Sequence, residues 1–583
     1  MSEASPFNLI DEPWIEVRLL DGTMSCESLS SIFEHSSQIR NISGELPTQA
    51  FAILRVLLAI LQRAILTAED FDEQARTANV WGELWRANDL PLDKLNRYLA
   101  EWHDRFNLFS EEKPFMQVAR IPTPQNGTWP IRKIIADIPD RFQFYTMRTG
   151  RGASAITYAE AARWLIHVHA FDTSGFKHKT HESQRVARNG LVGSVSPGWA
   201  TKIGCVYFEG NNLRETLLLN LVLGNIGSPS YFIPTQDLPA WERPQNLAFG
   251  VVRQPDGFAD IYTWQSRRVL LVPDRDRDNV VRVILGYGDT FTTKVEGHDP
   301  LSPANLHGVE PMSAWKRIQN QKRKATNAQI LPADHEKNRA LWRGLSSLLP
   351  SSERDGGANL IPGIVSWVRY LTSDDGRNQI PEDMAIRMRA CAVFLDGNKT
   401  KTKEVMDDRI SFSSSLLLED NLYLVDAAQE CVSCTERAIQ ALGFLARDIY
   451  TATGGRRDPN RGMGRRDSSD GAYDSATEWA YFTLDAPFRK WLAELSPEGA
   501  TPDERDNYAL GTRKKWVETA HRIIHHIGEQ LVSDANPQAF IGHPTESGHM
   551  TIGKAYQRFS WALNKALPLA DGHPQASTFD DKE

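Results

Sequence analysis

The stretch Phe7-Asn8-Leu9-Ile10-Asp11-Glu12-Pro13-Trp14-Ile15 joins an apolar run to an acidic kink that contains proline. Proline lacks a backbone N–H and fixes its own φ, so Pro13 stiffens the exit from the run. The segment therefore predicts a short buried strand that enters a turn.

Beyond this segment, the first 400 or so residues mix helical and strand patterns without a regular order. Apolar side chains recur at helical spacing over 49–65, which predicts a helix, and two further helices are predicted over 159–169 and 213–223. Strands are predicted over 269–272, 280–285 and 390–395. Because strands and helices do not alternate regularly, a doubly wound parallel sheet is not expected.

From about residue 410 the pattern becomes helical. Long amphipathic segments run over 426–451, 475–495, 512–532 and 551–567. Helices joined by polar or glycine- and proline-rich loops predict a four-helix bundle. The expected fold class is therefore α+β, with a large irregular mixed α/β domain over 1–408, a four-helix bundle over 409–571 and a disordered tail over 572–583.

Composition bounds the class of protein. A chain of 583 residues is too long for one core. Its net charge of −8 argues against indiscriminate coating of nucleic acid but leaves room for local basic loops. Five cysteines leave one unpaired in any disulfide scheme, which favours a reducing compartment. With no signal peptide and no apolar run long enough to span a bilayer, we expect a soluble cytoplasmic protein without membrane contact.

No pattern of residues makes a persuasive enzyme. Cys431 and Cys434 form a lone CxxC inside a predicted helix, which favours two packed cysteines over a zinc site. The adjacent carboxylates Asp407 and Asp408 are the best candidate for a metal site, but two-metal chemistry needs several convergent carboxylates and no third partner is evident. We therefore expect no catalysis, no metal and no cofactor. A metal-dependent nuclease or hydrolase using Asp407 and Asp408 is the alternative.

Several segments, in order along nearly the whole chain, resemble the CasA-type large subunit of the type I-E CRISPR Cascade complex. They are the opening Asn-Leu-Ile-Asp-x-x-Trp-Ile, the Pro-Phe-Met-Gln of 114–117, and the segments 142–152, 175–177, 212–220, 299–303, 313–315 and 405–408, followed by the helical part. No single motif is diagnostic, but their order is specific.

The resemblance implies a subunit that binds DNA and catalyses nothing. Such a subunit recognises the protospacer-adjacent motif (PAM) in double-stranded DNA through the minor groove. It then starts strand separation for R-loop formation and helps recruit the helicase-nuclease. The implied partners are target DNA, the 5′ end of the guide RNA, the backbone and small subunits of Cascade, and the helicase-nuclease.

The resemblance places a glycine loop that approaches the minor groove at Gly175, Phe176, Lys177 and Lys179. Close approach requires residues without bulky side chains, and Gly175 is the best counterpart. Here residues 173–190 are basic rather than glycine-rich, which suggests additional phosphate contact. A surface insertion without a DNA role is the alternative.

A lysine finger is implied on the hairpin before Ser302-Pro303, and Lys294 is the nearest lysine. The alternative is an ordinary solvated lysine. The minor groove distinguishes A·T from G·C but little more, so such a reader should tolerate several PAM sequences.

The family also has a polar hairpin tip that acts as a wedge in the duplex. Residues 394–400 precede the 404–408 segment at the family's distance and carry the Asp-Gly signature of a tight hairpin, which makes Asn398 and Lys399 the expected wedge. Gln379 has the family's wedge chemistry but lies too early, and a plain surface turn is a further alternative. Finally, Arg148, Gly150 and Arg151 correspond to a loop that anchors the subunit near the guide RNA and adjoining subunits.

Overall fold

The structure is a computed structural model. It describes residues 7–569 apart from 123, 125–126, 139–147, 149, 183, 188, 226, 245–246, 275, 292–305, 307, 319–328, 353–358, 456–467, 498–503 and 546–547. The chain forms two compact units: unit 1 comprises 1–341, 347–349 and 353–410, and unit 2 comprises 342–346, 350–352 and 411–583. The last boundary between the two units, at 410/411, lies two residues beyond the expected 408/409. The short segments 342–346 and 350–352 also belong to unit 2, and no sequence pattern marks them. The expected tail over 572–583 lies outside the described residues.

Unit 1 combines helices with several small sheets. Its helices are α1 (Leu29–Glu34), α2 (Pro47–Leu66), α3 (Thr77–Arg86), α4 (Leu92–Glu101), α5 (Tyr158–Phe171), α6 (Leu213–Asn220), α7 (Phe258–Tyr262) and α9 (Gly363–Thr372). Helix α2 is the central one and packs against α4, α5 and α7. Its length and hydropathy would suit a membrane span, but its apolar window is entirely buried within the unit, as expected for a core helix.

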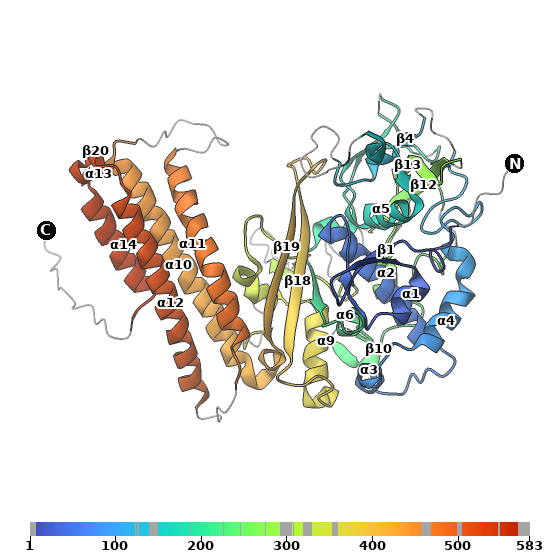
Figure 1. The fold of residues 1–583 in the computed structure, drawn as a ribbon, viewed down its shortest axis with the longest axis horizontal. Coiled ribbons are helices and arrows are strands. Elements are labelled where there is room, and N and C mark those ends of the chain that lie inside the picture. The colour runs from blue at the N-terminus through green and yellow to red at the C-terminus, as the bar shows by residue number, and fades with distance from the viewer. Residues whose placement is uncertain are drawn as a thin grey trace. The chain divides into compact units, whose positions relative to one another are not determined.

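Two sheets of unit 1 contact α2 through β3 and β18, and a third contacts α5 through β12. They are β2-β1-β3 (Met24–Glu27, Ile15–Leu19, Ile39–Ile42), β12-β13-β4 (Arg267–Asp274, Asn279–Tyr287, Trp129–Pro130) with β5 (Ile156–Thr157) also on β13, and β19-β18-β8 (Thr402–Ser413, Ala385–Leu395, Cys205–Glu209). In the last sheet β18 and β19 run side by side as two long strands (Figure 1). Strand β8 pairs antiparallel with β18, with Val206 opposite Ala390.

The remaining strands of unit 1 form short pairs and one three-stranded sheet. They are β6-β7 (Gly175–Lys177, Val192–Val195), β9-β10 (Gly224–Asn225, Ser228–Phe232), β11-β14 (Val252–Arg253, Thr290–Phe291) and β16-β15-β17 (Gln329–Pro332, Trp315–Ile318, Asn359–Leu360). The β6-β7 pair is antiparallel and carries the glycine loop.

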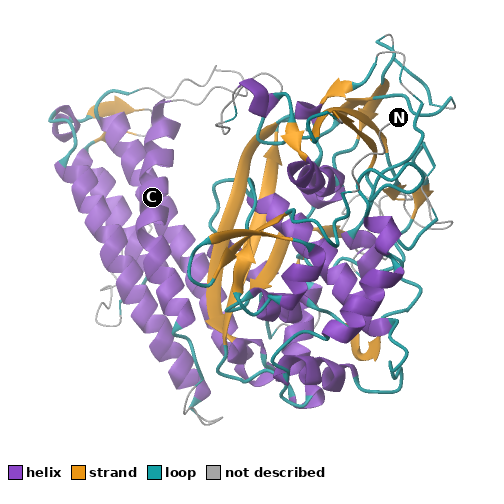
Figure 2. Cartoon of the chain, turned by 45° about the vertical axis from the view of Figure 1, so that its right-hand side comes forward, coloured by secondary structure: helices purple, strands orange, loops and turns teal. Residues whose placement is uncertain are grey.

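Unit 2 is a bundle of long helices that lie alongside one another (Figure 2). They are α10 (Leu422–Ala452), α11 (Ser468–Ala493), α12 (Arg505–Ser533) and α14 (Ile552–Ala566), with the short α13 (Gln538–Ile541) and the hairpin β20-β21 (His543–Thr545, Gly548–Met550) between the last two. Helix α10 packs against the other three long helices. Its Cys431 and Cys434 are buried and unbridged, and burial raises the pKa of the Cys431 thiol to about 12. The expected α+β class and helical bundle are confirmed.

The opening segment differs from its prediction, because the turn precedes the strand. Asn8 makes only an isolated bridge to Asn107, and its side-chain oxygen accepts a hydrogen bond from the Ile10 N–H at 2.9 Å. The Trp14 indole donates to the Leu9 carbonyl at 3.0 Å, which holds the turn closed over the buried Leu9 and Trp14. Strand β1 begins only after Pro13, at Ile15. Side-chain hydrogen bonds favour the turn in a way that the apolar pattern does not report.

Candidate nucleic-acid interface

The loop between β18 and β19 is a hairpin tip at the predicted place, although its left-handed residue is Lys399 and not the glycine of the Asp-Gly pair. The Asp396 carboxylate accepts hydrogen bonds from the backbone N–H groups of Thr400 and Lys401, at 2.6 and 2.9 Å. Lys399 takes a φ of +57°, a left-handed conformation that closes the turn. Asn398 and Lys399 are both exposed at this tip. The hairpin therefore presents these two side chains to solvent.

The glycine loop lies directly beside this tip. The Ser174 N–H donates to the Lys399 carbonyl at 2.7 Å, a contact that joins segments more than 220 residues apart in the chain. The next residue, Gly175, has a φ of +121°, which L-amino acids rarely adopt. A Cβ at this position would lie 3.9 Å from the Thr400 methyl group. The glycine loop and the hairpin tip are therefore direct neighbours in unit 1.

The side chains that follow Gly175 point in different directions. Phe176 is 49% exposed. Lys177 is only 5% exposed, and its ammonium pairs with the Asp172 carboxylate at 2.7 Å. Lys179 is half-buried.

Lys177 does not face solvent, so we leave it out of the proposed DNA contacts. Burial lowers the pKa of its ammonium, opposed by the charge of Asp172. Burial would raise the pKa of Asp172, but Lys177 and Arg267 together lower it. Arg267, from β12, completes this buried cluster through its own ion pair with Asp172. Lys177 therefore stabilises the glycine loop from inside unit 1, through its ion pair with Asp172.

Lys202 is a cation near the hairpin tip that lies outside every predicted motif. It closes a short 3-10 helix, Trp199–Lys202. Burial, with smaller contributions from the charges of Arg267 and Lys399, lowers the pKa of its ammonium to about 8. A nearby phosphate would favour the charged form. In the sequence Lys202 stands alone among apolar and small residues, so no charge pattern marks it.

The structure describes Arg148, Gly150 and Arg151 of the expected anchoring loop but not the expected lysine finger. Arg148 is enclosed by three carboxylates, Glu45 at 3.1 Å, Asp137 at 3.3 Å and Glu160 at 2.8 Å. Burial disfavours this charge, but the carboxylates, Glu160 first, raise the pKa of the guanidinium overall. Gly150 and Arg151 lie in the 3-10 helix Gly150–Ala153, where Gly150 is exposed with a φ of +54°. Lys294 lies outside the described residues.

The carboxylates of the alternative metal site are engaged by the protein. Both Asp407 oxygens accept from the Arg389 guanidinium, at 2.6 and 2.7 Å. Asp408 accepts from the backbone N–H groups of Leu341 and Arg409, each at 2.7 Å. They are successive residues of β19, and successive side chains of a strand point to opposite faces. Within the described ranges, no group of three or more His, Cys, Asp or Glu side chains is placed to hold a metal ion.

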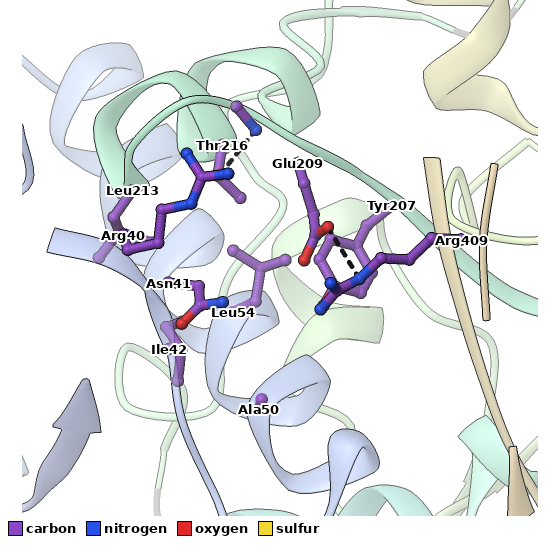
Figure 3. A pocket seen from close by; sticks show the side chains of 11 residues that line it. Arg40, Asn41, Ile42, Ala50, Leu54, Tyr207, Glu209, Leu213, Thr216 and Arg409 are labelled. Carbon is purple, nitrogen blue, oxygen red and sulfur yellow. Dashed lines mark hydrogen bonds and ion pairs between the residues drawn. The ribbon is translucent and has the colours of Figure 1, made fainter. Parts of the chain in front are cut away.

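A small pocket beside this cluster does not suit a substrate. It is lined on one side by Arg40 and on another by Glu209, whose carboxylate pairs with Arg409 at 3.2 Å (Figure 3). Its volume is about 60 Å³. Small-molecule sites usually measure about 300–1,000 Å³, so this pocket fits little more than water or one small group.

Comparison with known proteins gives a consistent result. The family model of the CRISPR-associated protein Cse1 matches residues 8–527. The chain in the crystal structure of Thermobifida fusca Cse1 is 35% identical in sequence to this one. The two structures match with a TM-score of 0.78, over 97% of this chain and 98% of that one. The CRISPR-associated protein CasA/Cse1 of Thermus thermophilus is 26% identical over 535 residues, which cover 89% of this chain and 93% of the relative.

A chain from a solved CRISPR RNA-guided surveillance complex shares the fold. Its TM-score is 0.66, and the match covers 96% of this chain and 99% of that one. At 18% identity, this likeness concerns the fold alone.

Proposed function

The chain belongs to the CRISPR-associated Cse1 family, and from this premise we propose that it is the non-catalytic DNA-recognition subunit of a type I-E Cascade surveillance complex in the cytoplasm. In this proposal it reads the PAM of double-stranded DNA through the minor groove and begins the strand separation that leads to an R-loop. Its partners are target DNA, the 5′ end of the guide RNA, the other Cascade subunits and the helicase-nuclease that it helps recruit. Base pairing between guide and target supplies sequence specificity beyond the PAM.

One observation carries the proposal: the hydrogen bond between Ser174 and Lys399 places the glycine loop against the hairpin tip. In this arrangement Gly175 lets the backbone approach the minor groove while Asn398 and Lys399 press into the neighbouring base step. Inserting a wedge costs a few kcal/mol of unstacking, which contacts to the PAM must offset. Because this hydrogen bond joins the two elements, binding at one acts on the duplex at the other.

Other residues have supporting roles in the proposal. Lys202 attracts phosphates beside the tip, Lys179 remains a predicted phosphate contact of the glycine loop, and Lys294 remains the predicted minor-groove finger. Gly150 and Arg151 remain the predicted contact to the guide RNA or neighbouring subunits. Arg148 organises the start of that loop, because its guanidinium is already shared among three carboxylates.

The wedge role is tested by comparing R-loop formation on two substrates. In the assembled complex, Asn398→Ala combined with Lys399→Ala should slow R-loop formation on a fully paired target. The slowing should be much smaller on a target with a pre-opened bubble next to the PAM, because the bubble has already met the unstacking cost.

The matched control is Lys113→Ala, which removes an exposed lysine from another loop of unit 1. It should leave both rates unchanged. Equal slowing of the double variant on both substrates would mean that the tip only attracts the backbone, and the wedge would have to be sought elsewhere.

A further inference from the structure

A large cavity opens between the glycine loop, the hairpin and the segment around β4. Its volume is about 570 Å³, within the range of about 300–1,000 Å³ typical of sites that enclose a ligand. Its walls come from Trp129, the largely apolar segment 132–136, the end of α5, residues 172–177 and residues 400–402. All of these segments belong to unit 1.

The charge of the lining favours an anion. Arg132 and Lys401 line the cavity together with Lys133 and Lys177. Among the described lining residues the only carboxylate is Asp172, which is already held between Lys177 and Arg267. Arg132 and Lys401 therefore add positive charge to the lining, which suits a phosphate.

The lining also offers an aromatic surface. Phe176 borders the cavity and is 49% exposed. Trp129 borders it as well, but its ring already packs against His178, with centroids 4.0 Å apart, and the Lys133 ammonium lies 5.4 Å from its centre. Phe176 is thus the ring with a face available for stacking. A positive groove with an aromatic platform is the usual design of sites for unpaired nucleotides.

Position decides which nucleic acid can reach it. Thr400 and Lys401 belong both to the cavity wall and to the hairpin whose tip carries Asn398 and Lys399. The cavity therefore lies next to the place where the proposed wedge would separate the strands.

We propose that this cavity receives an unpaired DNA nucleotide released beside the hairpin, with its base stacked on Phe176 and its phosphate near Arg132 and Lys401. The inference rests on the proposed function and deepens it: captured in this way, the first opened nucleotide cannot re-pair. It also moves Phe176 from the minor-groove contact expected from the sequence to a contact with single-stranded DNA.

The test uses the assembled complex and target DNA with a pre-opened bubble beside the PAM, so that capture is measured apart from duplex opening. Abasic sites are introduced one at a time near the PAM on each strand. At one position the abasic site should weaken binding by the parent complex about 5- to 150-fold, the range for loss of one base–aromatic stack. Phe176→Ala should cause a similar loss on intact DNA and no further loss on that abasic DNA.

Tyr231→Ala is the matched control, because Tyr231 is an aromatic residue of β10 with 72% exposure that does not line the cavity. Its effect should be negligible on every substrate. If the loss of binding from Phe176→Ala and the loss from an abasic site multiply at every position of the abasic site, the two act independently and the proposal is overturned. So would a Phe176→Ala complex that loses guide RNA, because the cavity would then serve RNA. A separate measurement tests PAM reading itself: a parent complex that binds a PAM duplex and a scrambled duplex equally would refute it. The bubble assay does not depend on that result.

Discussion

Replacing Gly175 by aspartate or asparagine separates two contributions of the glycine loop. Gly175 has a φ of +121°, a conformation that is strained for any residue with a side chain, so both variants carry this strain. The added Cβ meets only the Thr400 methyl group, at 3.9 Å, which is ordinary contact. Both variants should therefore fold, with the same local strain of about 1–3 kcal/mol. They have nearly the same shape and differ only in charge.

The charge sets the expected difference. A carboxylate about 4 Å from one phosphate is disfavoured by about 1 kcal/mol in water and by about 4 kcal/mol at an effective dielectric constant of about 20. If Gly175 faces the DNA backbone, Gly175→Asp should bind PAM duplex at least about fivefold more weakly than Gly175→Asn. The gap should shrink as salt rises, because exposed charges are screened over about 8 Å at physiological ionic strength.

The measurement is the dissociation constant of assembled complexes for a PAM duplex at low and high salt. Equal incorporation of both variants into the complex confirms that they fold alike. If Gly175→Asp and Gly175→Asn bind DNA equally at both salt concentrations, Gly175 does not approach the phosphates, and the loop must be removed from the interface.

Three further outcomes are expected. Lys399→Ala should reduce the slope of log affinity against log salt by about one, whereas Lys177→Met should lower the melting temperature and leave that slope unchanged; a reduced slope for Lys177→Met would return this lysine to the interface. The purified protein should cleave neither DNA nor RNA with Mg²⁺ or Mn²⁺, and cleavage that disappears in Asp407→Ala would overturn the non-enzymatic proposal. Burial lowers the pKa of His167 from 6.5 to about 3. Between these two pH values the imidazole is neutral in the folded protein and takes up a proton when the protein unfolds. The stability of the parent relative to His167→Gln should thus fall by up to about 1.4 kcal/mol per unit as the pH drops from 6.5 towards 4, and a difference independent of pH would contradict a neutral buried imidazole.

Local patterns predicted the elements whose formation depends on neighbouring residues. Helix α2 and the long helices of unit 2 follow from apolar side chains at helical spacing, because such spacing reports directly which face is buried. The hairpin tip at Asn398 was predicted from the Asp-Gly pair, and its position is right, but the left-handed backbone falls on Lys399 and the Asp396 carboxylate closes the turn. The family resemblance likewise needed only the order of short motifs.

Side-chain direction and partners were decided by tertiary structure. Nothing local shows that Lys177 turns inward while its neighbour Phe176 stays exposed. That outcome depends on Asp172 being shared with Arg267, which lies 95 residues away in the chain. The contact between Ser174 and Lys399, which unites the glycine loop with the hairpin, is equally invisible in the sequence. Periodicity records burial along one element, whereas ion pairs and cavities depend on where the chain returns, and only the fold determines that.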